Sequence, residues 1–226
     1  MVNDAMTQVQ GPIGLSALTG NHEEGKKQIS EFLSLFTWFI LFFYLVLTFF
    51  SKEILYVMTD VRFHSAYKLV SVLAFLYVMS GVYRIFTTVL SFHGKMWVIS
   101  SAAIISALVS MILNLIFIPY FGQWAAAWAS FFSVMGYTAW LIIWSQKFDP
   151  LPINYSLIIL SLILAMVLVI TNIYIDNFKL LSFWGNICMK FLFLFVYILP
   201  IYLLPPMSEI RIALSKTTDK FIATFR

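Results

Sequence analysis

Six long, uninterrupted apolar segments occupy most of the chain and restrict its possible folds more than any other feature. They cover residues 32–50, 69–90, 96–118, 124–144, 155–175 and 183–204. A helix needs about 20 mostly apolar residues to cross a bilayer, whereas a strand of a membrane barrel would alternate over about ten. Hydrophobic residues make up 62% of the chain and charged residues 11%, while soluble domains average about 25% charged. The sequence predicts an all-α integral membrane protein with six transmembrane helices.

The remaining segments are short or polar. Residues 1–30 are consistent either with a tail and a membrane-surface turn or with the end of a polar-faced membrane helix over 2–18, and composition alone favours the tail. Residues 51–67 form the longest connection between spans, with room for one short surface helix. The bulky segment 32–50 is expected to face lipid over much of its circumference. Cys188 lies inside a span and is expected to be a small buried residue.

The basic residues outside the spans are distributed unevenly between the two sides of the predicted membrane protein. One side, which holds both ends of the chain, carries Lys26, Lys27, Lys95, Lys147, Arg211, Lys216, Lys220 and Arg226. The other side carries Lys52, Arg62, Lys68 and Lys179. Cytoplasmic loops are enriched in lysine and arginine, so both termini are expected in the cytoplasm. The connection at 119–122 would then face outward and the connection at 93–95 inward.

A tight hairpin is predicted between the third and fourth segments, at Pro-Tyr-Phe-Gly, 119–122. Pro119 is disfavoured inside a helix because it lacks an N–H, and Gly122 tolerates the backbone angles of a corner. Small residues then cluster on one side of segment 124–144, as in helices that pack closely in membranes. The predicted packing hairpin comprises Pro119, Gly122, Ala125, Ala126, Ala129 and Ser130.

Two neighbouring spans carry polar stripes at helical spacing. Tyr77, Ser80, Arg84 and Thr87 share a face of segment 69–90, and a second stripe runs from Ser100 to Asn114. Such faces turn toward protein or water rather than hydrocarbon, so they serve either helix packing or a substrate cavity. Helix packing is the favoured interpretation of the second stripe. It is less favoured for the first stripe, because packing does not require the guanidinium of Arg84. The cavity candidates are Tyr77, Ser80, Arg84, Thr87, Ser106, Ser110 and Asn114.

The sequence offers little for catalysis. The three histidines lie in separate segments, and neither a glycine-rich phosphate loop nor a nucleophile elbow occurs. We therefore expect no enzyme, no cofactor and no metal site. A membrane glycosyl polymerase or ligase, which would depend on Arg62 or His64 in the outer connection, is a weaker alternative. Lys190 in the last span is expected to snorkel toward the membrane surface.

The hairpin also carries a resemblance. Its pattern Asn114-x4-Pro119-x2-Gly122-x3-Ala126-Ala127-x-Ala129-Ser130 resembles that of polysaccharide and O-antigen flippases of the multidrug/oligosaccharidyl-lipid/polysaccharide exporter superfamily. Ala125 stands where glycine is common in that family. The preceding Gly94-Lys95 and the charged break with Pro150-Leu151-Pro152 are similar as well. These motifs concern packing, and they indicate a family rather than a substrate.

The resemblance implies the C-terminal half of a two-lobed transporter. Residues 1–30 would be the end of a truncated helix and a cytoplasmic connection, 31–145 a four-helix core, 146–205 the last helix pair and 206–226 a cytoplasmic tail. The implied activity is flipping of an undecaprenyl-diphosphate-linked oligosaccharide across the bacterial inner membrane for surface polysaccharide or O-antigen synthesis. The implied partners are the bilayer, that lipid-linked oligosaccharide, a missing N-terminal lobe and other polysaccharide-assembly membrane proteins, but no nucleic acid.

Two alternatives stay open. A small-molecule or drug exporter of the same superfamily would be expected to use intramembrane acids for ion coupling, and no Asp or Glu lies within a predicted span. A non-functional truncated remnant of a transporter is the other alternative, because a complete flippase would need both lobes.

Overall fold

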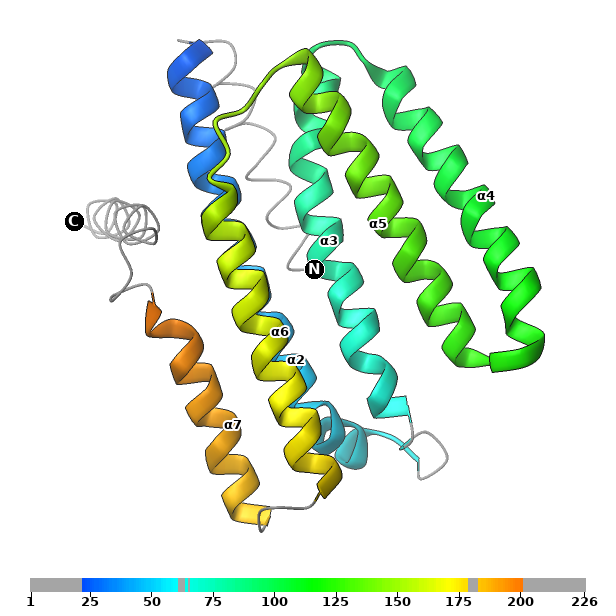
Figure 1. Cartoon of the computed structure of the whole chain (residues 1–226), viewed down its shortest axis with the longest axis vertical. Coiled ribbons are helices and arrows are strands. Elements are labelled where there is room, and N and C mark those ends of the chain that lie inside the picture. Colours follow the sequence, from blue (N-terminus) through cyan, green and yellow to red (C-terminus); the bar gives the residue numbers. More distant parts are fainter. Residues whose placement is uncertain (1–21, 61–63, 65, 179–182, 201–226) are drawn as a thin grey trace. The chain divides into compact units, whose positions relative to one another are not determined.

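The computed structural model describes residues 22–60, 64, 66–178 and 183–200, and its regular elements in these ranges are helices (Figure 1). They are α2 (His22–Met58), α3 (Tyr67–Phe92), α4 (Met96–Phe121), α5 (Gln123–Phe148), α6 (Tyr155–Phe178) and α7 (Phe183–Ile198). The predicted all-α fold is confirmed for this part of the chain. The predicted helix remnant at 2–18 and the tail at 206–226 lie outside the described residues.

Five of these helices are long and apolar enough to cross a membrane: Gly25–Met58, Leu69–Phe92, Met96–Phe121, Gln123–Phe148 and Tyr155–Asp176. The sixth predicted span, 183–204, is described as far as residue 200, and its apolar helix Trp184–Ile198 is shorter. The 16 residues of α7 would cover about 24 Å at 1.5 Å per residue, less than the roughly 30 Å of hydrocarbon in a bilayer. The chain is a multi-pass membrane protein by helix length and composition.

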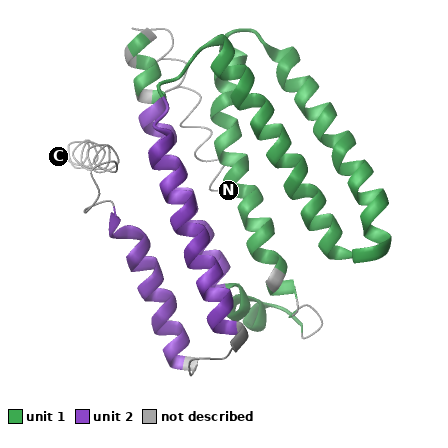
Figure 2. Ribbon diagram, viewed as in Figure 1, with its two compact units in different colours: residues 1–29, 51–152 green, residues 30–50, 153–226 purple. Residues whose placement is uncertain are grey.

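The chain divides into two compact units (Figure 2). Unit 1 comprises residues 1–29 and 51–152, and unit 2 comprises residues 30–50 and 153–226. Residues 30–50 therefore cluster with the last helices, whereas the sequence analysis grouped them with a core at 31–145. The predicted four-part division stays a prediction.

Helix α2 is longer than predicted, with 37 residues instead of the span 32–50. It would measure about 55 Å at 1.5 Å per residue, so it exceeds a bilayer core of about 30 Å. Residues 51–58, expected to begin a connection, continue the helix because they contain no Gly or Pro to end it. The expectation that this segment mainly faces lipid is wrong, since Leu33, Leu41 and Leu45 are at most 1% exposed.

Aromatic side chains connect residues 30–50 of α2 with α7 inside unit 2. Ring pairs join Trp38 with Tyr197 at 5.5 Å, Phe49 with Phe193 at 5.9 Å and Phe50 with Phe191 at 5.5 Å between centroids. The buried Tyr197 hydroxyl also donates to the Trp38 carbonyl at 3.2 Å. These contacts fix the depth of α7 against α2, because the Trp38–Tyr197 pair is at least one turn away from the other two pairs on both helices.

Two predictions for α7 are wrong. Lys190 does not snorkel: its side chain is fully buried, with Nζ 5.7 Å from the centroid of the Phe50 ring. Cys188 is exposed rather than buried. Both errors have the same physical origin, because a uniformly apolar helix does not reveal from its sequence which face meets its neighbours.

In unit 1, α5 lies between α3 and α4 (Figure 1). Small side chains make this close approach possible, and Ala125, Ala127, Ala129 and Ser133 of α5 are buried. The predicted four-residue turn before α5 is shorter than expected. Helix α4 continues through Pro119 to Phe121, and the chain reverses at Gly122 alone, with φ 56° and ψ −133°. A proline near the end of a helix forfeits one hydrogen bond there, while the Gly122 N–H still bonds to the Ile118 carbonyl at 2.8 Å.

We expect Gly122→Ala to destabilise the protein by about 1–3 kcal/mol, the cost of forcing a side chain into such a backbone conformation. An added Cβ would meet no atom within 4 Å, so strain and not a clash causes the loss. Gly136→Ala is the matched control, because its Cβ is equally free and alanine favours a helix by about 0.5–1 kcal/mol. SDS-induced unfolding in mixed micelles, followed by circular dichroism, measures both. Equal effects would contradict the role of the Gly122 corner.

Candidate functional site

The polar stripe of α3 consists largely of hydroxyls that are bonded within their own helix. The Ser80 hydroxyl donates to the Tyr77 carbonyl at 2.8 Å, and the Thr87 hydroxyl donates to the Arg84 carbonyl at 2.7 Å. Such back-bonding satisfies the hydroxyl proton within the helix. Tyr77 is 71% exposed, and Arg84 is half-buried. Arg84 is thus the cationic donor of this face.

The stripe of α4 is divided between packing and exposure. The Ser106 hydroxyl donates to the Ser133 carbonyl of α5 at 2.9 Å, which ties the two helices together. The Asn114 amide donates to the Ser110 hydroxyl over a long 3.4 Å, and its buried Oδ1 accepts no hydrogen bond from the described residues. Ser100 is exposed.

The two predicted stripes do not face each other directly, because α5 lies between their helices (Figure 1). Tyr83 of α3 and Tyr137 of α5 meet edge to face, with centroids 4.8 Å apart. Tyr137 in turn lines a small cavity together with Ser106. The candidate residues of α3 and those of α4 therefore do not line one common cavity, and α5 lies between them.

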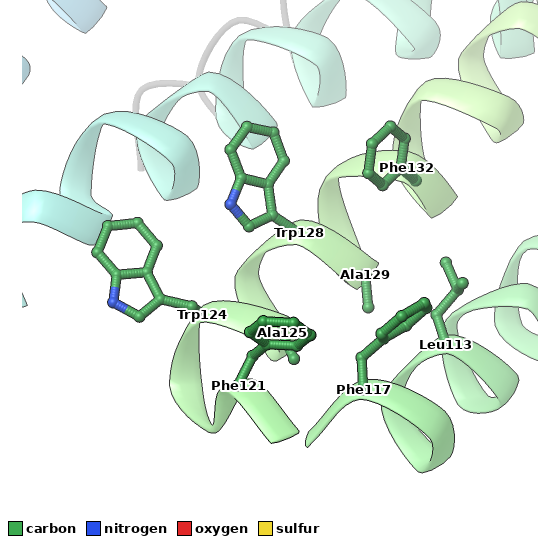
Figure 3. Close-up of a pocket in the computed structure, with 8 residues that line it drawn as sticks. All are labelled: Leu113, Phe117, Phe121, Trp124, Ala125, Trp128, Ala129 and Phe132. Carbon is green, nitrogen blue, oxygen red and sulfur yellow. The ribbon is translucent and has the colours of Figure 1, made fainter. Parts of the chain in front are cut away.

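Two cavities lie between α4 and α5. The smaller, about 230 Å³, has Ser106, Ser133 and Tyr137 among its lining residues. The larger, about 510 Å³, is lined entirely by apolar and aromatic residues, namely Leu113, Phe117, Phe121, Trp124, Ala125, Trp128, Ala129 and Phe132. Aromatic side chains surround the two alanines of this groove (Figure 3). Phe132 lines both cavities, so the two spaces adjoin along one helix pair.

Of the hairpin residues, Ala125 and Ala129 are buried, while Ala126 and Ser130 are half-buried. The Ser130 hydroxyl donates to the Ala126 carbonyl at 2.9 Å. Pro119 and Gly122 are exposed at the reversal. The small side chains therefore do two things: they admit the neighbouring helix, and they leave room for the larger groove.

An ionic cluster at the opposite end of unit 1 went unnoticed in the sequence. Lys26 Nζ lies 2.7 Å from Asp149 Oδ1, and His93 Nε2 lies 2.8 Å from Asp149 Oδ2. Asp149 is 2% exposed and Lys26 is 9% exposed. Glu23 adds a weaker contact, at 3.7 Å from Lys26. One sequence signal was available. The distribution of basic residues places the predicted connections that contain Lys26, His93 and Asp149 on the same side of the membrane.

Local structure positions each member of this cluster. Helix α3 ends with bonds from the Gly94 N–H to the Ser91 carbonyl and from the Lys95 N–H to the Leu90 carbonyl, the pattern of a Schellman cap. Gly94 takes the required positive φ of 67°, and the cap orients His93. Asp149 follows the last turn of α5, where a helix dipole disfavours a carboxylate. Nearby cations are therefore needed to compensate the cost of burying this negative charge.

Burial alone would raise the pKa of Asp149, but hydrogen bonds from Lys26 and His93, together with their charges, hold that pKa below its ordinary value. The carboxylate therefore stays ionised at neutral pH. Among the described residues, no group of three or more His, Cys, Asp or Glu side chains could hold a metal ion. The cluster is thus an ion-pair network in which one buried carboxylate accepts from two separate chain segments.

Comparison with known proteins returned no matching family model, no similar curated protein and no similar solved structure.

Proposed function

We propose that this chain is a lobe of a membrane transporter that flips an undecaprenyl-diphosphate-linked oligosaccharide across the bacterial inner membrane. The observation that carries the proposal is the combination, within unit 1, of a half-buried guanidinium on a membrane-spanning helix and an apolar groove of about 510 Å³. An ionisable residue inside a span is costly and is commonly functional. The hairpin pattern from Asn114 to Ser130 supports the same family of transporters.

The proposed substrate requires both features. Its diphosphate is anionic, and a guanidinium can pair with phosphate oxygens through two parallel hydrogen bonds. Its polyprenyl tail is apolar and needs a surface such as the aromatic groove between α4 and α5. Ser106 and Tyr137 line a cavity that does not include Arg84, so they would contact the first sugar and not the diphosphate. In this proposal the chain acts as a transporter and not as an enzyme, and it needs neither a cofactor nor a metal.

The proposed orientation follows the positive-inside rule. Lys26, His93 and Asp149 would lie at the cytoplasmic end, and Gly122 at the outer end. A second lobe would complete the translocation path, and transport would arise from one lobe rocking against the other. A cation-coupled drug exporter is not favoured by a specific observation, because the buried Asp149 lies beyond the end of α5 and is engaged by two basic side chains.

Disruption of the reading frame in the encoding bacterium tests the proposal. We expect loss of the surface polysaccharide or O-antigen, and restoration when the intact gene is supplied in trans. Unchanged surface glycan after disruption would contradict the proposal and would favour the non-functional remnant.

A further inference from the structure

The buried ion cluster of unit 1 lies close to two places where the chain passes into unit 2. Lys26 is three residues before residue 29, where unit 1 ends for the first time, and Asp149 is three residues before residue 152, where it ends again. Their side chains meet at 2.7 Å. Two chain segments that each lead from unit 1 into unit 2, and that are more than 120 positions apart in sequence, are thus joined by one ion pair.

We propose that Lys26, Asp149 and His93 form an ionic clamp, which fixes the start of α2 and the segment after α5 to the α3–α4 turn. His93 supplies the third attachment through its 2.8 Å contact with Asp149, and the Gly94 cap holds His93 in place. The clamp does not depend on which substrate the protein transports.

The segment after Asp149 is also restrained. The Leu151 N–H donates to the Gln146 side-chain oxygen at 3.1 Å, and the Gln146 amide donates back to the Leu151 carbonyl at 3.5 Å. Pro150 and Pro152 further limit the backbone. In the other segment, α2 continues without a break from His22 to Met58. Both segments are therefore restrained on the unit 1 side of residues 29 and 152.

The low pKa of Asp149 supports a permanent clamp and not a pH switch. Its carboxylate stays charged from neutral pH down to its ordinary titration range. Its contacts among the described residues include Lys26 from α2 and His93 from the α3–α4 turn, with Glu23 on the far side of Lys26. A neutral histidine can still donate through Nε2, so the connection persists when His93 loses its charge.

Pulsed EPR distances in nanodiscs test the clamp. Spin labels are placed at Lys27→Cys and Met96→Cys, both exposed positions of unit 1, in a Cys188→Ser background. We expect one narrow distance peak in this background and its loss in Asp149→Asn, in Lys26→Met and in the double variant. Glu23→Gln, which removes an 85% exposed carboxylate from the same lysine, should keep the narrow peak.

The double variant Lys26→Met/Asp149→Asn decides the outcome. It removes the charge of both members of the 2.7 Å pair, so it is expected to fold even where a single variant does not. Loss of the narrow peak in this variant supports the clamp, and retention of the peak overturns it. Failure of the clamp leaves the transport proposal intact, because glycan export is measured separately.

Discussion

Asp149→Ala is expected to lower the free energy of unfolding by about 3–5 kcal/mol, because removal of one partner leaves a buried charge uncompensated. Lys26 would lose its 2.7 Å contact while its side chain remains only 11% exposed. The same change would release His93 from the end of α5. SDS titration in mixed micelles, followed by circular dichroism, measures the loss.

Glu23→Ala is the matched control for this variant. Glu23 contacts the same lysine, but at 3.7 Å and with a side chain that is 85% exposed. Exposed pairs contribute roughly 0–1 kcal/mol, so the control should differ little from wild type. Similar losses in both variants would contradict the assignment of the cluster's stability to the buried carboxylate.

The pH dependence of the free energy of unfolding is a second measurement of the contribution of Asp149. A carboxyl group whose folded pKa is depressed stabilises the protein above its unfolded pKa, about 3.9 for aspartate, and this contribution is lost as pH falls through the folded value. The contribution of Asp149 should therefore be constant from pH 7 to about pH 5 and decline below about pH 4. Asp149→Asn should abolish that part of the decline.

Arg84→Ala is expected to reduce glycan export by about ten- to a hundredfold, since a hydrogen bond to a charged group contributes about 1.5–3 kcal/mol. Arg84→Lys should restore part of the activity, because it keeps the charge but not the planar pair of donors. Surface glycan is quantified in cells whose membranes contain equal amounts of each variant.

Lys147→Ala serves as the control for loss of one cation at the end of a span. Lys147 is exposed near the end of α5, with Nζ 5.0 Å from the Trp144 ring. It should export at the wild-type rate. Wild-type export by Arg84→Ala at equal membrane abundance would remove Arg84 from the proposed site while leaving the transporter proposal to other residues.

Local sequence patterns predicted those parts of the fold that depend on solvent and backbone. Apolar runs of about 20 residues indicate membrane helices because a bilayer has a fixed thickness, and the described helices agree. The corner at Gly122 was predicted for the same kind of reason, since few residues adopt its positive φ of 56°. The face of α5 that carries small side chains indicated that another helix packs closely against it.

Partners across the fold could not be predicted in the same way. Periodicity shows that Arg84 and Ser106 lie on polar faces, but it does not show that α5 separates α3 from α4. The pairing of Lys26 with Asp149 joins positions far apart in sequence, and each residue alone is typical of a solvated loop. The prediction for Lys190 failed for a related reason. A long cationic side chain is expected to reach water, but here it is fully buried.

The distribution of the lipid-linked oligosaccharide between the two membrane leaflets is the measurement that tests the flippase proposal most directly. In cells with the disrupted gene, the intermediate should accumulate in the cytoplasmic leaflet, protected from a membrane-impermeant glycosidase added to the periplasmic side. The intact gene should restore its cleavage. An intermediate that is fully cleaved without this protein would contradict the proposal and place the defect after translocation.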